Sequence, residues 1–273
     1  MPCLMPSLMH WLPLMSESLK IITRGQGPEL VLLHGWAMHS GIWGGLVDQL
    51  AVEFRVSLVD LPGHGVNGHV PLSSDLDEVA GQISAELPPA IWLGWSLGGL
   101  VTLAAALRQP HKVKKAILVA ATPCFSKQAE WDLGVSLAQQ QAFANGLEED
   151  FEGALKQFCQ QCFGTTRVEE SLDRLGYSPI ADKVPARNVL HTGLHLLYGS
   201  NLIAGLATCK VPTLFLGGTR DRTIRPESFG QAAAMMPAGR SSLIRGAGHA
   251  PFISHEEAFL AIIRQFIHGD QSG

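Results

Sequence analysis

The stretch IWLGWSLGGL, from Ile91 to Leu100, decides the fold because an apolar run ends in the pattern Gly-x-Ser-x-Gly. This pattern predicts a buried strand that turns sharply into a helix, with Ser96 held at the turn in a strained backbone conformation and its hydroxyl pointing outward. Gly94 and Gly98 flank the turn, where side chains would collide as the strand and the helix cross closely. On the motif alone, a glycine-rich turn with a capping serine stays open as the alternative.

Apolar runs of strand type alternate with amphipathic helical stretches around this turn. Strands are predicted at 29–35, 55–60, 90–94, 115–123, 212–218 and 241–246, and helices at 41–50, 76–87 and 97–109. Continuous apolar strands that are separated by helices predict an α/β fold, in which a mostly parallel central sheet is covered by helices on both faces.

The alternation stops between Pro123 and Leu206, where the pattern is helical only. An all-helical block between two strands of one sheet is most simply a cap over the edge of that sheet. We therefore predict an α/β core at 15–122 and 207–268, a helical cap at 123–206 and a disordered extension at 1–14.

A serine hydroxyl needs a histidine to take its proton and a carboxylate to orient that histidine. In enzymes built around such a turn the chain order is serine, acid, histidine. Asp221 follows the predicted strand at 212–218, and His249 follows the next one, so parallel strands bring both loops to the edge that holds Ser96. Two weaker candidates are Asp60, which precedes the serine, and His255, which falls in a predicted helix.

Acyl transfer also needs N–H donors for the oxyanion of the tetrahedral intermediate. One predicted donor is the backbone N–H of Leu97, directly after the serine. The other is the backbone of Trp36, in the loop LLHGWAM after the first predicted strand. The indole of Trp36 would wall the pocket, although a place in the core is the other interpretation.

Composition and charge narrow the classes of partner. The chain has 273 residues, 20 basic and 24 acidic, with a formal charge of −4, so we expect no surface for nucleic acid or anionic lipid. No run of about 18 apolar residues is present, which argues against a membrane span. Five cysteines, an odd number, fit a reducing cytoplasm. We expect a monomer.

Two motifs suggest cofactors, but neither fits. Gly63, Gly65 and Gly68 satisfy Gly-x-Gly-x-x-Gly, yet no helix opens at the last glycine and no acidic residue ends a following strand about 20 positions on, so we expect no dinucleotide. Cys159 and Cys162 form Cys-x-x-Cys without a second ligand pair, and we interpret them as packed thiols. We therefore expect neither a cofactor nor a metal ion.

The sequence resembles the α/β-hydrolase superfamily from about Leu19 to Phe266, through LVLLHGW, IWLGWSLGGLV, PCFS and HAPFISH. Within it, the chain is most similar to the carboxylesterases of biotin synthesis that demethylate pimeloyl-[acyl-carrier protein] methyl ester. The resemblance implies an α/β-hydrolase fold, the triad Ser96, Asp221 and His249, and contacts of Trp36 and Leu97 with the ester carbonyl. It also implies substrate contacts along one stretch of the cap: Phe158, Cys159, Gln160, Gln161 and Cys162.

One departure concerns the carrier protein. The resemblance implies that basic cap residues bind an acidic acyl carrier protein, yet residues 123–206 hold six basic and ten acidic residues. A local cluster could still suffice, and its members would be Lys156, Arg174, Lys183 and Arg187. A general esterase, a carbon–carbon hydrolase, an acyltransferase and a non-enzymatic receptor stay open as alternatives.

Overall fold

The computed structural model describes residues 18–163 and 184–269, so the extension predicted at 1–14 lies outside the described residues. Seven strands form one sheet in the order β1-β3-β2-β4-β5-β6-β7. They are β1 (Ile21–Arg24), β2 (Glu29–Leu33), β3 (Arg55–Val59), β4 (Ala90–Trp95), β5 (Val113–Val119), β6 (Thr213–Gly218) and β7 (Gly239–Ile244). All pairs are parallel except β1 with β3, which is antiparallel. The predicted α/β fold with a mostly parallel sheet is therefore confirmed.

The strand β1 is the one that the sequence reading does not contain. Three of its four residues are only partly buried and Arg24 is exposed, because β1 forms the edge of the sheet and pairs with a single neighbour, β3. Such a short, half-buried segment carries no clear alternation of apolar and polar residues, which is the signal that identifies a strand.

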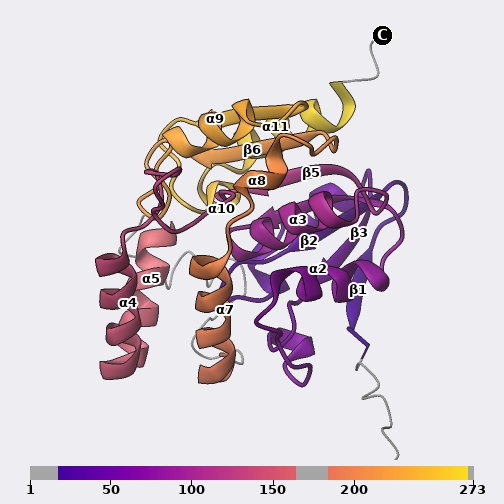
Figure 1. Ribbon diagram of the computed structural model, residues 1–273. Helices are drawn as coiled ribbons and strands as arrows, with labels where there is room; N and C mark the ends of the chain where they lie inside the picture. The colour runs from indigo at the N-terminus through magenta and orange to yellow at the C-terminus, as the bar shows by residue number, and fades with distance from the viewer. Residues whose placement is uncertain (1–17, 164–183, 270–273) are drawn as a thin grey trace, which may run out of the picture.

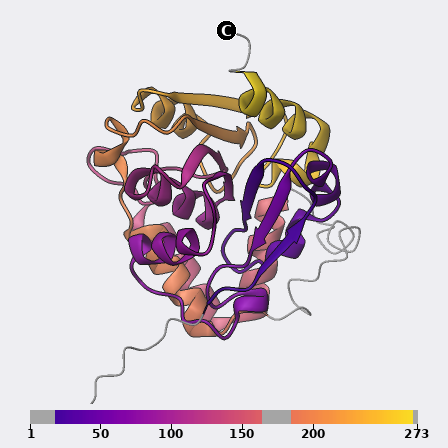
Figure 2. The same ribbon diagram turned by 90° about the vertical axis from the view of Figure 1, so that its right-hand side faces the viewer.

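Helices cover both faces of the sheet, as Figures 1 and 2 show. Val31 and Leu33 of β2 belong to one buried cluster, with side chains of α2 (Leu76–Ala85), α3 (Leu97–Arg108) and α9 (Glu227–Ala234). Leu30 and Leu32 point to the other face, where α1 (Leu46–Ala51) and α11 (Glu256–His268) pack. Successive strand residues thus face opposite layers, and both layers are apolar.

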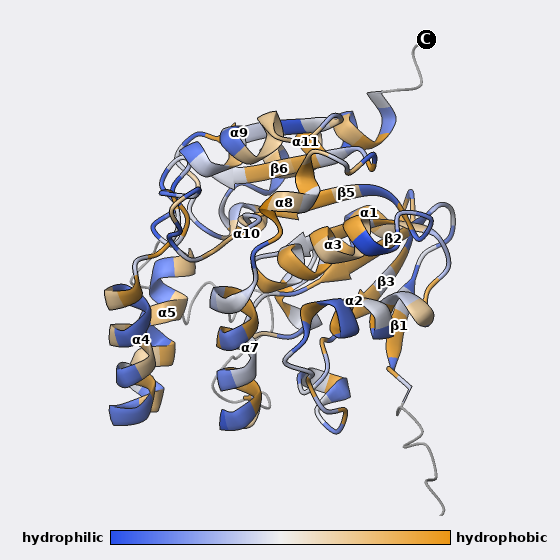
Figure 3. Cartoon of the chain, viewed as in Figure 1, coloured by the Kyte–Doolittle hydropathy of each residue, from blue (hydrophilic) through white to orange (hydrophobic). Residues whose placement is uncertain are grey.

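The block between β5 and β6 contains α4 (Leu137–Glu149), α5 (Phe151–Phe163), α7 (Arg187–Gly199) and α8 (Ile203–Leu206). We refer to α4, α5 and α7 as the cap helices. They lie together beside one edge of the sheet in Figure 1, and Figure 3 shows hydrophobic and hydrophilic residues alternating along α4 and α7. Ser136 caps the N-terminus of α4 through a capping box with Gln139. The short turns Ser40–Trp43, Gly65–Asn67 and Pro251–Ser254 (α10) complete the described helices.

The strand order reverses direction between β2 and β4. The chain goes from β2 to β3 on one side, and then returns to place β4 on the other side of β2. The loops after β2 and β4 therefore leave the sheet next to each other at its carboxyl edge. In open α/β sheets this position is where ligands bind.

Candidate active site

Ser96 occupies the sharp turn between β4 and α3, with φ 54° and ψ −114°. A left-handed φ is rare for a residue with a side chain and is typically found at functional sites. The turn is held by a hydrogen bond from the Ser96 N–H to the carbonyl of Val119, 2.9 Å long. The glycines around it are required sterically, since a Cβ at Gly94 would lie 2.1 Å from the carbonyl oxygen of Gly98.

His249 and Asp221 form a buried pair on the loops after β7 and β6. His249 Nδ1 lies 2.8 Å from Asp221 Oδ2, and neither side chain is exposed to solvent. The other carboxylate oxygen, Oδ1, accepts hydrogen bonds from the backbone N–H groups of Thr223 and Ile224, at 2.8 and 3.0 Å. A carboxylate accepts only, so the imidazole donates through Nδ1, and in the neutral ring the lone pair is then on Nε2.

The Nε2 atom of His249 is buried and has no hydrogen-bond partner among the described residues. Its ring lies beside Trp95, the residue before Ser96, with 5.8 Å between ring centroids, and the Trp95 indole N–H donates to the His249 carbonyl at 2.8 Å. The structure thus brings Ser96, Asp221 and His249 to one edge of the sheet, without a hydrogen bond between the serine and the imidazole. Such bonds are often long in the absence of substrate and tighten when substrate binds.

The two predicted oxyanion donors lie on adjacent loops. Leu97 is the first residue of α3, so its N–H has no acceptor within the helix. Trp36 follows Gly35, where an added Cβ would lie 2.9 Å from the Trp95 ring and 3.3 Å from Ser96 Cβ, so this loop approaches the turn closely. The buried Trp36 indole donates to the carbonyl of Leu190 in α7, at 2.9 Å.

Asp60, the weaker candidate for the catalytic acid, instead stabilises a turn of the backbone. Its two carboxylate oxygens accept hydrogen bonds from the backbone N–H groups of Ser40 (2.6 Å) and Val66 (2.8 Å). Burial alone would raise its pKa, but His34 and these N–H groups hold the pKa of Asp60 below its ordinary value. This network closes the turn that contains Gly63, Gly65 and Gly68, and burial lowers the pKa of the neighbouring His64 to about 3.

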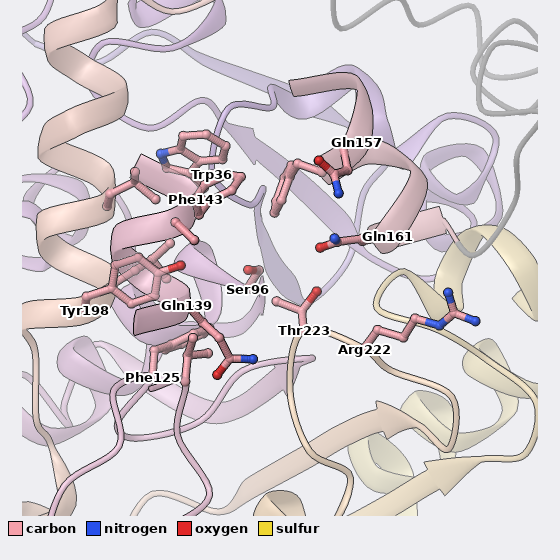
Figure 4. A pocket seen from close by; sticks show the side chains of 15 residues that line it. Trp36, Ser96, Phe125, Gln139, Phe143, Gln157, Gln161, Tyr198, Arg222 and Thr223 are labelled. Carbon is pink, nitrogen blue, oxygen red and sulfur yellow. The ribbon is translucent and has the colours of Figure 1, made fainter. Parts of the chain in front are cut away.

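A cavity of about 510 Å³ opens above Ser96 between the sheet edge and the cap helices (Figure 4). Trp36 packs edge-to-face on Phe158 and Phe143, with centroid distances of 5.1 and 5.5 Å, and these rings form an apolar wall. The lining residues are Trp36, Ser96, Phe125, Val135, Gln139, Ala142, Phe143, Gln157, Phe158, Gln161, Leu194, Leu197, Tyr198, Arg222 and Thr223.

The five cap residues expected to contact substrate divide by helix face. Phe158 and Gln161 line the cavity, whereas Cys159 and Cys162 are buried in the core cluster on the far side, and Gln160 is not among the lining residues. The reason is helical geometry, because five consecutive residues spread around the axis and only those three or four apart share a face. Burial raises the pKa of Cys159 to about 12.

Several lining residues were not expected from the sequence. Arg222 and Thr223 directly follow Asp221, and Gln157 lies one turn of α5 before Gln161. Their closeness to predicted site residues could have identified them as lining residues. Tyr198, on α7, belongs to no motif. No group of three or more metal-ligating side chains occurs within residues 18–163 and 184–269, and none of the helices there combines the length and apolar composition of a membrane span.

Comparison with known proteins gives matches over most of the chain. The sequence profile of the Alpha/beta hydrolase family matches residues 30–262. The pimeloyl-[acyl-carrier protein] methyl ester esterase of Xylella fastidiosa strain M12 is 40% identical over 246 residues, which cover 89% of this chain and 96% of that protein. The enzyme of the same name from Stenotrophomonas maltophilia strain K279a is 38% identical, over 89% of this chain and 94% of that protein.

Solved structures with the same fold are more distant in sequence. An esterase from Exiguobacterium antarcticum superposes with a TM-score of 0.78 at 20% identity, over 91% of this chain and 95% of that one. An enol-lactonase from Burkholderia xenovorans superposes with a TM-score of 0.77 at 20% identity, over 91% and 96% of the two chains.

Proposed function

The chain belongs to the alpha/beta hydrolase family and is a carboxylic ester hydrolase, and from that premise we propose that Ser96, His249 and Asp221 are its catalytic triad. The observation that carries this proposal is the buried Asp221–His249 hydrogen bond. It leaves Nε2 of His249 without a partner among the described residues, and the His249 ring packs against Trp95, the neighbour of Ser96 at the strained turn. We also propose the division into a core at 15–122 and 207–268 and a cap at 123–206.

The proposed reaction has two halves. His249 Nε2 takes the proton of Ser96 as the serine oxygen attacks the ester carbonyl, and the N–H groups of Leu97 and Trp36 stabilise the oxyanion. The imidazolium then protonates the departing alcohol, which leaves an acyl-enzyme. Water, deprotonated by the same Nε2, attacks the acyl group and releases the acid. Asp221 stays ionised and holds the imidazole in the required tautomer.

We propose that the substrate is pimeloyl-[acyl-carrier protein] methyl ester, so that the alcohol is methanol and the step belongs to biotin synthesis. The names of relatives that are about 40% identical over most of the chain support this choice. The aromatic wall of Trp36, Phe143 and Phe158 supports it independently, since it offers apolar surface to the methylene groups of an acyl chain.

Two measurements test the proposal. Ser96→Ala should abolish hydrolysis of p-nitrophenyl butyrate and labelling by a serine-directed fluorophosphonate, while the thermal unfolding curve stays that of a folded protein. Turnover by this variant at the unaltered rate would exclude the mechanism. The unaltered protein should release methanol from the carrier-bound ester with a higher kcat/KM than from dimethyl pimelate, and the reverse order would identify a general esterase.

A further inference from the structure

Four arginines occur on the two loops that carry the proposed acid and base. They are Arg220, Arg222 and Arg225 after β6, and Arg245 after β7. The only carboxylate on residues 219–226 and 245–250 is Asp221, which is buried against His249. All four arginine side chains are exposed. We call these four residues the arginine rim.

The loops after β6 and β7 form one surface because hydrogen bonds join their backbones. The Arg220 N–H donates to the carbonyl of Ala247 at 2.9 Å, and the Thr219 N–H donates to the carbonyl of Ile244 at 3.1 Å. The Gly246 N–H donates in turn to the Thr219 hydroxyl oxygen at 2.9 Å. Arg245 and Arg220 are therefore held on neighbouring segments of the same edge.

Few carboxylates of the described chain neutralise the positive charges of the arginine rim. Arg225 lies 3.9 Å from Glu227, at the limit of an ion pair, and has Asp132 as a further acidic neighbour. Arg220, Arg222 and Arg245 make no ion pair with any residue in the described ranges 18–163 and 184–269. Exposed guanidinium groups without carboxylate partners are the usual means of binding carboxylates and phosphates of another molecule.

Arg222 connects this surface to the cavity. It is the only charged residue among the 15 that line the cavity in the described part of the chain. Figure 4 shows its side chain extending away from Ser96, on the side of the cavity where Gln161 and Thr223 also lie. An ester at Ser96 whose remote end is anionic would meet a positive charge there.

The cap has the opposite balance. Its described residues, within 123–163 and 184–206, hold six acidic and three basic residues, and the segment 164–183 adds four acidic and three basic ones. Among the described bases of the cap, Lys127 pairs with Asp132 and Arg187 lies over the ring of Phe151. Arg174 and Lys183, members of the predicted docking cluster, lie outside the described residues. An acidic partner would be repelled by most of the described surface of the cap.

We infer that the arginine rim, and not the cap, is the docking surface for the acidic acyl carrier protein. This inference rests on the substrate proposed above. Carboxylates of the carrier face Arg220, Arg225 and Arg245, and the phosphodiester of the prosthetic arm passes Arg222 as the acyl chain enters the cavity. Electrostatic attraction of this kind steers encounter and fixes orientation, so it acts on KM and on the association rate more than on the chemical step.

The test compares two charge reversals of equal size. One variant carries Arg220→Glu and Arg245→Glu in the rim, and its matched control carries Lys156→Glu and Arg187→Glu in the cap. For each folded variant, methanol release gives KM for the carrier-bound methyl ester and KM for dimethyl pimelate. We expect the rim variant to raise the ratio of the first KM to the second by about tenfold or more, and the cap variant to change it less than about twofold.

The opposite pattern, with the ratio raised by the cap variant and unchanged in the rim variant, would overturn the inference while leaving the substrate intact. If the unaltered enzyme hydrolyses dimethyl pimelate but not the carrier-bound ester, the proposed substrate itself fails and the docking surface fails with it. A measurement that needs no variant is the effect of sodium chloride, which should raise KM for the carrier-bound ester and leave KM for dimethyl pimelate unchanged. Equal salt effects on both substrates would also overturn the inference.

Discussion

Replacing Gly98 by alanine tests whether the close approach of α3 to β2 sets the catalytic geometry. A Cβ at position 98 would lie 2.4 Å from the carbonyl oxygen of Leu33 and 2.5 Å from that of His34, whereas packed Cβ atoms essentially never lie within 3.0 Å of another heavy atom. Both obstructing atoms are backbone and cannot rotate away. The helix and the strand end must therefore separate by about 0.6 Å or more.

This displacement falls between the two proposed oxyanion donors, because Leu33 and His34 directly precede the loop of Trp36, while Gly98 directly follows Leu97. Misplacement of catalytic groups by about 1 Å costs roughly 10²-fold in rate, and loss of one oxyanion donor costs about 10²- to 10³-fold in kcat. We expect Gly98→Ala to lower kcat by about 10²-fold, equivalent to about 2.7 kcal/mol, with little change in KM. Overpacking should also lower the free energy of unfolding by about 1–3 kcal/mol.

The assay is steady-state hydrolysis of p-nitrophenyl butyrate together with urea unfolding of each variant. Gly45→Ala is the neutral control, since a Cβ there has no heavy atom within 4 Å. Gly99→Ala is the steric control. Its Cβ would lie 2.4 Å from Ala121 Cβ and 2.9 Å from the carbonyl oxygen of Gly94, so it would meet the ends of β5 and β4 and not the Trp36 loop. If Gly98→Ala keeps kcat within threefold of the unaltered enzyme, or loses no more activity than Gly99→Ala, the geometric reasoning is refuted.

Three further predictions concern buried groups. Asp221→Asn should lower kcat about 10⁴-fold, because an amide N–H facing His249 Nδ1 would move the imidazole proton to Nε2; ester hydrolysis within tenfold of the unaltered rate would contradict this. The pKa of His64 is lowered from 6.5 to about 3 in the folded protein, so between these pH values only the unfolded chain is protonated at this residue. The free energy of unfolding should therefore fall as the pH falls through this range, by up to about 1.4 kcal/mol per pH unit. In His64→Gln the unfolding free energy, followed by urea titration at several pH values, should fall less steeply on acidification, and an equal slope would exclude this origin. Burial raises the pKa of the Cys159 and Cys162 thiols, so Ellman's reagent should reach them only after denaturation, and fast reaction of either in the native protein would show that the cap packs differently.

The fold was predictable because its signals are local. All six strands expected from apolar runs are present, and the Gly-x-Ser-x-Gly turn follows from steric rules that act over a few residues. The positions of Asp221 and His249 followed from one further rule, that parallel strands deliver their loops to one edge. Their catalytic assignment stays a prediction that the experiments above address.

The cavity wall was less predictable because it depends on how separate helices pack. The sequence gives no indication that α7 would bring Tyr198 and Leu194 to the same cavity as Phe158 of α5. The stretch from Cys159 to Cys162 shows the same limit, since contiguity in sequence does not place residues on one helix face. The edge strand β1 carried too few buried positions to show a period.

The cap helix α5 is hydrogen-bonded to the loop that carries His249. The N–H of Ala250, the neighbour of His249, donates to the carbonyl of Cys162 in the last turn of α5, at 3.1 Å. A displacement of α5 away from the core would break this hydrogen bond and remove one restraint on the backbone next to His249, the proposed base. The position of the proposed base therefore depends on the position of α5, although His249 and α5 lie far apart in the sequence.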